Sequence, residues 1–123
     1  MKLTEIINAR NVIMQHTQDK IKAKLAYSFM KFLKATDNDE VFFRQREREI
    51  IEKYCLRDEN NELINNNGAF SIDPEKMEEC SKEVNELNNI DTEDCTITFN
   101  INDLETLQLS TEEISSLYPF IQE

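Results

Sequence analysis

Ile21-Lys-Ala-Lys-Leu-Ala-Tyr-Ser-Phe-Met-Lys-Phe-Leu33 is the stretch that decides the fold of this sequence. Its apolar residues recur at intervals of three and four, which places them on one face of an α-helix, and lysines occupy the other faces. Apolar residues resume after the polar run at 36–40, so either one helix spans residues 19–55 or two helices meet near Asp37. Because neither Gly nor Pro interrupts this span, we expect the single long helix.

Shorter helices are predicted on both sides of this stretch. Residues 4–16 form a first helix, with Thr4 as its expected N-cap. A second runs from 73 to about 88 and begins at Asp73-Pro74, a capping side chain followed by the ring that suits the first helical position. Its apolar residues fall on one stripe: Met77, Cys80, Val84 and Leu87. A capping box, Ser110-Thr-Glu-Glu113, predicts a last helix over 111–118.

Two segments are typical of β structure. A hairpin is predicted within 56–73, because Asn65-Asn-Asn-Gly68 can take the positive φ angles of a tight reversal, and short apolar segments flank it. Residues 95–101 alternate between apolar and polar side chains, which predicts a half-buried strand. The apolar face of this strand would carry Cys95, Ile97, Phe99 and Ile101.

Length and composition agree with this set of elements. The chain has 123 residues, the size of one ordinary domain, and its single Gly and two Pro favour long helices. Seven Phe and three Tyr supply a modest core. We therefore expect a single domain, residues 1–123, of the α+β class and mainly helical: a long helix plus shorter helices, packed with a β-hairpin and one further strand.

The charge of the chain is strongly negative and unevenly distributed. The formal net charge is −11, which argues against a general phosphate-binding surface for nucleic acid. Residues 1–72 hold 12 basic and 11 acidic side chains, whereas residues 73–123 hold 2 basic and 14 acidic ones. The acidity therefore belongs to the C-terminal half.

Two sets of charged residues are candidates for binding a partner. One is acidic and lies on the predicted helix of residues 73–88: Glu78, Glu79, Glu83 and Glu86. The other comprises Arg44 and Arg48, which could bind an acidic partner or a phosphate. The alternative for both sets is a solvated helix face, because Arg44 with Glu47 and Arg48 with Glu52 are spaced as local ion pairs.

No group of residues in the sequence indicates catalysis or a bound cofactor. The only histidine, His16, lies in a polar context and no spacing pairs it with a cysteine, so we expect it to be exposed or to cap a helix. The cysteines at 55, 80 and 95 lack the paired spacing of a zinc site. The acidic run that begins at Asp58 lacks both the Gly and the twelfth-position Glu of a calcium loop. We expect no enzyme, no metal and no cofactor.

The sequence indicates an intracellular protein. No stretch approaches the roughly 20 apolar residues that cross a bilayer, and the first residues lack the apolar block of a signal peptide. Three cysteines without paired spacing are expected to be reduced thiols, most of them buried.

Several phrases of the sequence resemble one family, a group of small uncharacterised proteins carried by phages and prophages of Gram-positive bacteria. The resemblance covers nearly the whole chain, and in two places where the family often has Gly, this sequence has Cys55 and Asn61. It implies a phage origin, hence the bacterial cytoplasm or the virion, and no known activity. The phrases are Lys24-Leu-Ala-Tyr-Ser-Phe-Met-Lys31, Ile50-Ile-Glu-Lys-Tyr54, Asp58-Glu-Asn-Asn-Glu62, Phe70-Ser-Ile-Asp-Pro74 and Leu109-Ser-Thr-Glu-Glu113.

Three functions fit these observations. The first is a phage protein that acts by protein–protein contact, as a virion component or an assembly factor. The second is an inhibitor of a host defence or nucleic-acid-binding protein, whose acidic face over 73–123 imitates phosphates. The third, a regulator that binds nucleic acid through its lysines and arginines, is the least expected. We also expect a homodimer through the long helix, because its phenylalanines exceed what this small body can cover: Phe29, Phe32, Phe42 and Phe43.

Overall fold

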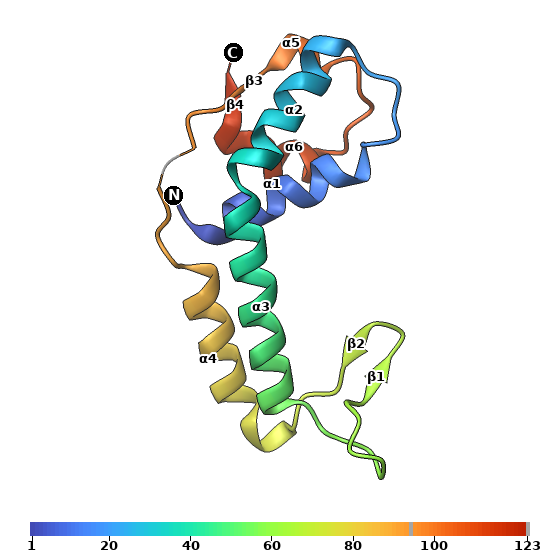
Figure 1. Ribbon diagram of the computed structural model, residues 1–123, viewed down its shortest axis with the longest axis vertical. Coiled ribbons are helices and arrows are strands. Elements are labelled where there is room, and N and C mark those ends of the chain that lie inside the picture. Colours follow the sequence, from blue (N-terminus) through green and yellow to red (C-terminus); the bar gives the residue numbers. More distant parts are fainter. Residues whose placement is uncertain (94, 123) are drawn as a thin grey trace.

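The molecule consists of a helical body and a two-helix arm that projects from it (Figure 1). The computed structural model describes residues 1–93 and 95–122. The helices of the body are α1 (Leu3–Gln15), α2 (Ala23–Ala35), α5 (Ile101–Leu104) and α6 (Thr111–Leu117). The arm is an antiparallel pair, α3 (Asp37–Tyr54) and α4 (Met77–Asn88), with a β-hairpin near its far end. The predicted class, mainly helical α+β, is confirmed. Within the described residues, no helix has both the length and the apolar character that crossing a lipid bilayer requires.

The preferred prediction of one helix over 19–55 is wrong, and the alternative of two helices is correct. The helices α2 and α3 are separated at Thr36, whose backbone is not helical. Arg10 of α1, buried at 8% exposure, causes the separation. Its Nη1 donates hydrogen bonds of 2.7 Å to the Leu33 carbonyl and to the Thr36 hydroxyl. In a continuous helix that carbonyl would instead accept from the backbone N–H four residues on.

The main core lies between α1, α2 and the C-terminal segment. Phe32 is fully buried, with its ring centroid 5.5 Å from that of Phe99 and 4.8 Å from that of Phe120. A second, smaller core fills the base of the arm and joins α1 to α3 and α4. Its buried members are Leu3, Ile7, Phe43 and Leu87.

This packing removes most of the surface on which the expected homodimer depended. Phe29, Phe32 and Phe43 are buried within the monomer, so they cannot form an interface between copies. Only Phe42 of the four phenylalanines remains exposed, at 40%. The expectation of a homodimer therefore loses three of the four side chains from which it was argued.

The predicted hairpin is confirmed, with a tighter turn than expected. Strands β1 (Asn65–Asn66) and β2 (Ala69–Phe70) pair in antiparallel register, and Asn67 and Gly68 form the reversal with φ of 56° and 90°. The Asn65 side chain accepts a 2.7 Å hydrogen bond from the Gly68 N–H. Asn61 also takes a positive φ, 62°, in the preceding turn.

The strand predicted over 95–101 is present but much shorter than predicted. Only β3 (Phe99–Asn100) is paired, in parallel with β4 (Ile121–Gln122). The Asn100 side chain accepts a 2.8 Å hydrogen bond from the Asn102 N–H, so the chain turns into α5 at Ile101. The alternation itself is real, because Cys95 and Ile97 are half-buried, Phe99 is buried and the residues between them are exposed.

The helix starts follow local signals, with one correction. Thr4 is not the N-cap of α1, since that helix begins at Leu3 and the Lys2 backbone N–H donates to the Glu5 carboxylate at 3.2 Å. The Asp73 side chain caps a short 3-10 turn, η1 (Pro74–Lys76), that leads into α4. The capping box of Ser110 and Glu113 forms as predicted and starts α6, which ends in a second 3-10 turn, η2 (Tyr118–Phe120).

Candidate functional site

The four candidate glutamates lie around the exposed part of α4, and Glu86 borders a hollow on each side of it. Glu83 forms a 3.1 Å ion pair with Lys53 of α3, and Glu86 lines the groove beside it. The pKa of the Glu83 carboxyl lies below its usual value because the Tyr54 hydroxyl and the Lys53 ammonium hydrogen-bond to its charged form. Glu78 and Glu86 both line a shallow outward depression of α4, and Glu79 is exposed.

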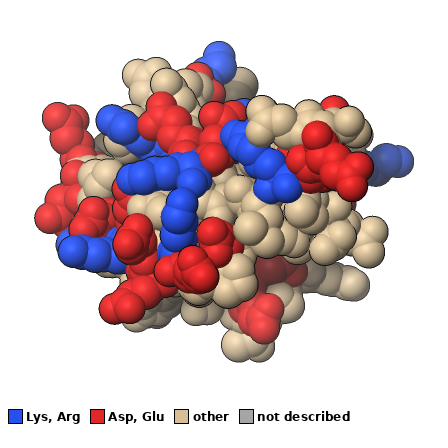
Figure 2. Space-filling view, turned by 90° about the horizontal axis from the view of Figure 1, so that it is seen from below, with Lys and Arg blue, Asp and Glu red and all other residues tan. Residues whose placement is uncertain are grey.

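The charges of Arg44 and Arg48 are neutralised within α3. Arg44 contacts Glu40 at 2.9 Å and Glu47 at 3.3 Å, and Arg48 contacts Glu52 at 3.1 Å. The predicted local ion pairs are therefore confirmed. Seen from the end of the arm, acidic and basic side chains lie interleaved (Figure 2). These arginines form no separate basic patch.

A groove of about 560 Å³ runs between α3 and α4. Its apolar lining is Phe42, Ile50, Leu87 and Ile90, and its charged rim is Arg46, Glu49, Lys53, Glu83 and Glu86. Arg46 and Lys53 are each paired with a rim glutamate, at 3.1 Å. Glu86 therefore leaves the rim with a net negative charge.

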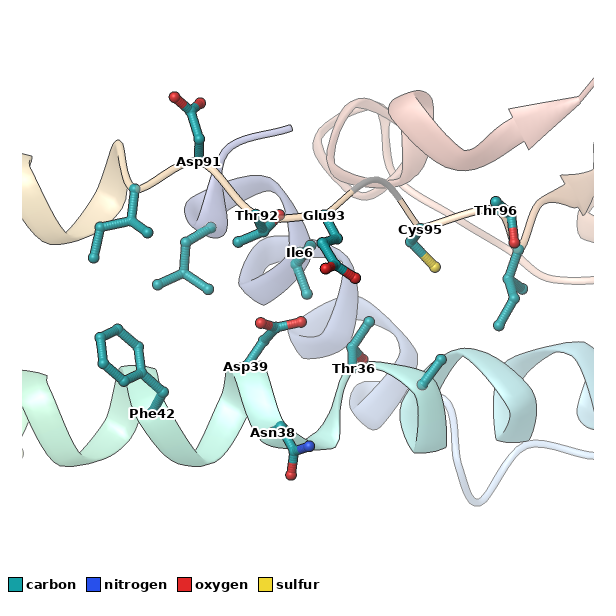
Figure 3. A pocket seen from close by; sticks show the side chains of 14 residues that line it. Ile6, Thr36, Asn38, Asp39, Phe42, Asp91, Thr92, Glu93, Cys95 and Thr96 are labelled. Carbon is teal, nitrogen blue, oxygen red and sulfur yellow. The ribbon is translucent and has the colours of Figure 1, made fainter.

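A second cleft, of about 490 Å³, lies where α1, the junction of α2 and α3, and residues 90–93 and 95–97 meet. Figure 3 shows the Asp39 and Glu93 side chains pointing into this cleft, whereas Asp91 and Asn38 point away. Within residues 1–93 and 95–122, neither Asp39 nor Glu93 forms an ion pair. The cleft thus combines an apolar floor with two uncompensated carboxylates.

Phe42 and Ile90 join the two hollows, since both residues line both of them. Phe42 is 40% exposed and Ile90 is 37% exposed. Single exposed apolar side chains are common on protein surfaces, whereas neighbouring ones that line a hollow together can contribute to a contact surface. We call this region the Phe42–Ile90 groove: the two hollows and the two side chains that join them.

The ionisable side chains that line the groove are carboxylates, one arginine, one lysine and one thiol. Its one thiol, Cys95, is on the floor of the second cleft, and the only histidine lies elsewhere. In the part of the chain that the structure describes, no three His, Cys, Asp or Glu side chains are grouped so that they could hold a metal ion. An apolar floor with a charged rim can bind a side chain or a helix of another protein.

His16 is the C-cap residue of α1, as one of the two expectations from sequence allowed, but its side chain is not exposed. Its side chain is 14% exposed and lies between two carboxylates, with Nδ1 2.6 Å from Asp19 Oδ2 and Nε2 2.5 Å from Glu113 Oε2. These hydrogen bonds, first to Asp19 and then to Glu113, raise the pKa of the imidazole above its ordinary value of 6.5. The histidine thereby fastens the end of α1 to the start of α6.

Sequence reasoning named Phe42 among the phenylalanines that the body cannot cover, but it missed Asp39, Glu93 and Ile90, which complete the groove. Phe42 had a usable signal, because adjacent phenylalanines on one helix point about 100° apart and a narrow core cannot cover both. Asp39, Glu93 and Ile90 had none, since only the meeting of three distant segments brings them together.

Comparison with known proteins adds no relative. The sequence matches no protein-family model, and no similar chain was found among curated proteins or solved structures.

Proposed function

We propose that this chain is a phage-encoded, non-catalytic protein that acts by binding another protein at the Phe42–Ile90 groove, as a virion component or an assembly factor. The observation that carries the proposal is the exposed pair of Phe42 and Ile90 at the join of two hollows. The phage origin is supported by the sequence phrases given above. Binding at the groove needs no reactive group.

The groove favours a partner that is basic and offers apolar side chains. Full burial of a side chain such as Phe or Ile stabilises a contact by about 1.5–3 kcal/mol. Phe42 and Ile90 are each little more than a third exposed, so each offers a fraction of this. Asp39 and Glu93 add attraction for Lys or Arg, and the net charge of −11 would accelerate encounter with a positive surface.

A second candidate function rests on the same two carboxylates. A basic partner could be a host defence or nucleic-acid-binding protein, which the chain would inhibit by occupying its phosphate-binding surface. Asp39 and Glu93, unpaired at an apolar cleft, favour this candidate. The identity of the captured partner distinguishes the two functions.

Affinity capture from phage-producing host cells tests the proposal, with Phe42→Ser as the test variant and Val41→Ser as its control. Val41 is adjacent on α3 and 58% exposed, but it does not line either hollow. We expect the wild type and Val41→Ser to retain the same partner and Phe42→Ser to lose it. A partner retained equally by all three would exclude the groove.

The nature of the partner then assigns the role. A virion protein, together with the presence of the chain in purified particles, supports the structural or assembly role. A host protein that binds DNA or RNA supports the inhibitory one.

A further inference from the structure

A third groove lies on the body, between the end of α1 and one flank of α2. It has a volume of about 520 Å³ and is mainly apolar. Its apolar lining consists of Ile13, Ile21, Ala26, Phe29, Met30 and Leu33. Met30 is 41% exposed, so the groove is open to a partner rather than sealed. We call it the α1–α2 groove.

Two lysines without local partners stand at the rim of this groove. Lys20 and Lys34 line it and are exposed, and within the described residues neither forms an ion pair. Asp19, the acidic residue next to Lys20 in the sequence, already binds His16 at 2.6 Å. The arginines of α3, by contrast, are each bound by a glutamate of the same helix.

The surroundings of the groove are positive although the protein is negative. Residues 14–36 contain five lysines and a single acidic residue, Asp19, whereas the whole chain has a net charge of −11. At physiological ionic strength, charges are screened beyond about 8 Å, so the distant acidic arm contributes little to this local field. The free positive charge at the groove is therefore that of Lys20 and Lys34, because Lys24 is paired with Asp103 at 3.8 Å. Asp19, which also lines the groove, and Glu113 are both bound to His16.

We propose that the α1–α2 groove binds an acidic amphipathic helix of a partner protein. The apolar face of that helix would enter between α1 and α2, and its flanking carboxylates would reach Lys20 and Lys34. A groove between two helices accepts the side-chain ridge of a third, which is a common mode of peptide recognition. A flat anionic lipid surface would contact the outer lysines but would leave the concave apolar floor unfilled.

This site is independent of the Phe42–Ile90 groove, whose acidic rim favours a basic partner. The chain would thus hold two partner segments of opposite charge on different parts of its surface. Such a molecule can bridge two proteins, or two sites on an assembly.

Fluorescence anisotropy with two synthetic helical peptides tests the proposal on the full chain. Both peptides carry Leu at helical spacing, and one has Glu and the other Lys on the flanks of the apolar face. We expect the Glu peptide to bind and the Lys peptide to bind at least about tenfold more weakly, because only the former complements the rim.

Variants locate the binding. Lys20→Glu with Lys34→Glu should weaken the Glu peptide about tenfold. The control, Lys22→Glu with Lys31→Glu, makes the same change in net charge at positions that do not line the groove and should cost much less. Ala26→Leu fills the groove without changing charge and should also weaken binding, which keeps the test valid if the double lysine variant does not fold.

Four outcomes would overturn the proposal: no binding of the Glu peptide, equal binding of both peptides, equal loss in both double variants, or no effect of Ala26→Leu. Binding to anionic phospholipid vesicles without binding to the Glu peptide would reassign the surface to a membrane. Phe42→Ser should leave peptide binding unchanged, so failure of this site and failure of the proposed function are distinguishable.

Discussion

At the scale of single residues, His16 makes a contact whose strength depends on pH. The imidazolium lies between the Asp19 and Glu113 carboxylates, which raise its pKa above 6.5. The pKa of Glu113 is lowered, chiefly by its hydrogen bond with His16. A raised pKa of a cation stabilises the fold at pH values below the unfolded pKa, and this contribution disappears as pH rises through the folded pKa.

The first prediction follows from the raised pKa of His16 and the lowered pKa of Glu113. The stabilisation by His16 should be largest between about pH 4.5 and 6.5, the ordinary pKa values of the two groups. It should be lost above the raised pKa of His16 and below the lowered pKa of Glu113. We expect His16→Gln to lower the free energy of unfolding more at pH 5.5 than at pH 8.5, measured by urea denaturation.

Glu113→Gln should reduce this pH dependence and leave the part that Asp19 contributes, whereas Glu112→Gln, at the exposed neighbouring position, should preserve it in full. A difference between wild type and His16→Gln that is the same at both pH values would contradict the assignment.

Arg10 is the second residue with a large predicted effect. Its guanidinium holds the Leu33 carbonyl, the Thr36 hydroxyl and, at 3.3 Å, the Glu40 carboxylate. Arg10→Met leaves these groups without their buried donor, so we expect a loss of about 2–3 kcal/mol in the free energy of unfolding. Arg48→Met breaks only an exposed pair and should cost less than about 0.5 kcal/mol. Equal losses in the two variants would mean that the junction does not depend on Arg10.

At the scale of elements, the separation of α2 from α3 explains where sequence reasoning succeeded and failed. The helix starts at Asp73 and Ser110 and the reversal at Asn67–Gly68 were predictable, because each depends on residues within a few positions. The break at Thr36 was not, because Arg10 lies 26 residues away in sequence. The strand predicted over 95–101 was too long for the same reason, since the partner of β3, β4, is 22 residues further along the chain and pairs only with Phe99 and Asn100.

The candidate site was less predictable than the fold. Of the residues named from the sequence, Glu83 and Glu86 do line the groove, because they lie beside Leu87, a buried member of the predicted stripe on α4. Met77 and Val84 of that stripe are exposed. Arg44 and Arg48 follow the alternative prediction, because they form ion pairs within their own helix. The second cleft depends on how the arm meets the body, which no local pattern encodes.

The turn of the β-hairpin gives a third prediction. Gly68 has φ of 90°, and a Cβ added there would meet no atom within 4 Å. Gly68→Ala should therefore destabilise the hairpin through backbone strain alone, by about 1 kcal/mol. Gly68→Asn should cost less, because Asn tolerates positive φ. Amide hydrogen exchange of residues 63–72 measures the effect, and equal exchange in the two variants would contradict it.

At the scale of the whole molecule, the acidic half of the sequence does not form one face. Its helix α4 packs on α3 in the arm, whereas α5 and α6 pack on α2 and α1 in the body (Figure 1). The predicted acidic surface over 73–123 is therefore divided. Any imitation of phosphates would have to come from a local group, and the unpaired Asp39 and Glu93 are the group that faces an apolar cleft.

The last prediction separates the electrostatic and apolar parts of binding at the Phe42–Ile90 groove. Attraction between the acidic rim and a basic partner is screened by salt, whereas burial of Phe42 is not. Once a partner is captured, its affinity should fall as salt rises. Asp39→Asn with Glu93→Gln should flatten that dependence, and Phe42→Ser should lower affinity at every salt concentration without changing the slope.

Glu59→Gln with Glu105→Gln makes the same change in net charge at exposed positions outside the groove and should leave both slope and affinity close to wild type. If this control flattened the salt dependence as much as the cleft variant, the partner would be responding to the total charge of the protein, and Asp39 and Glu93 would have no special part in recognition.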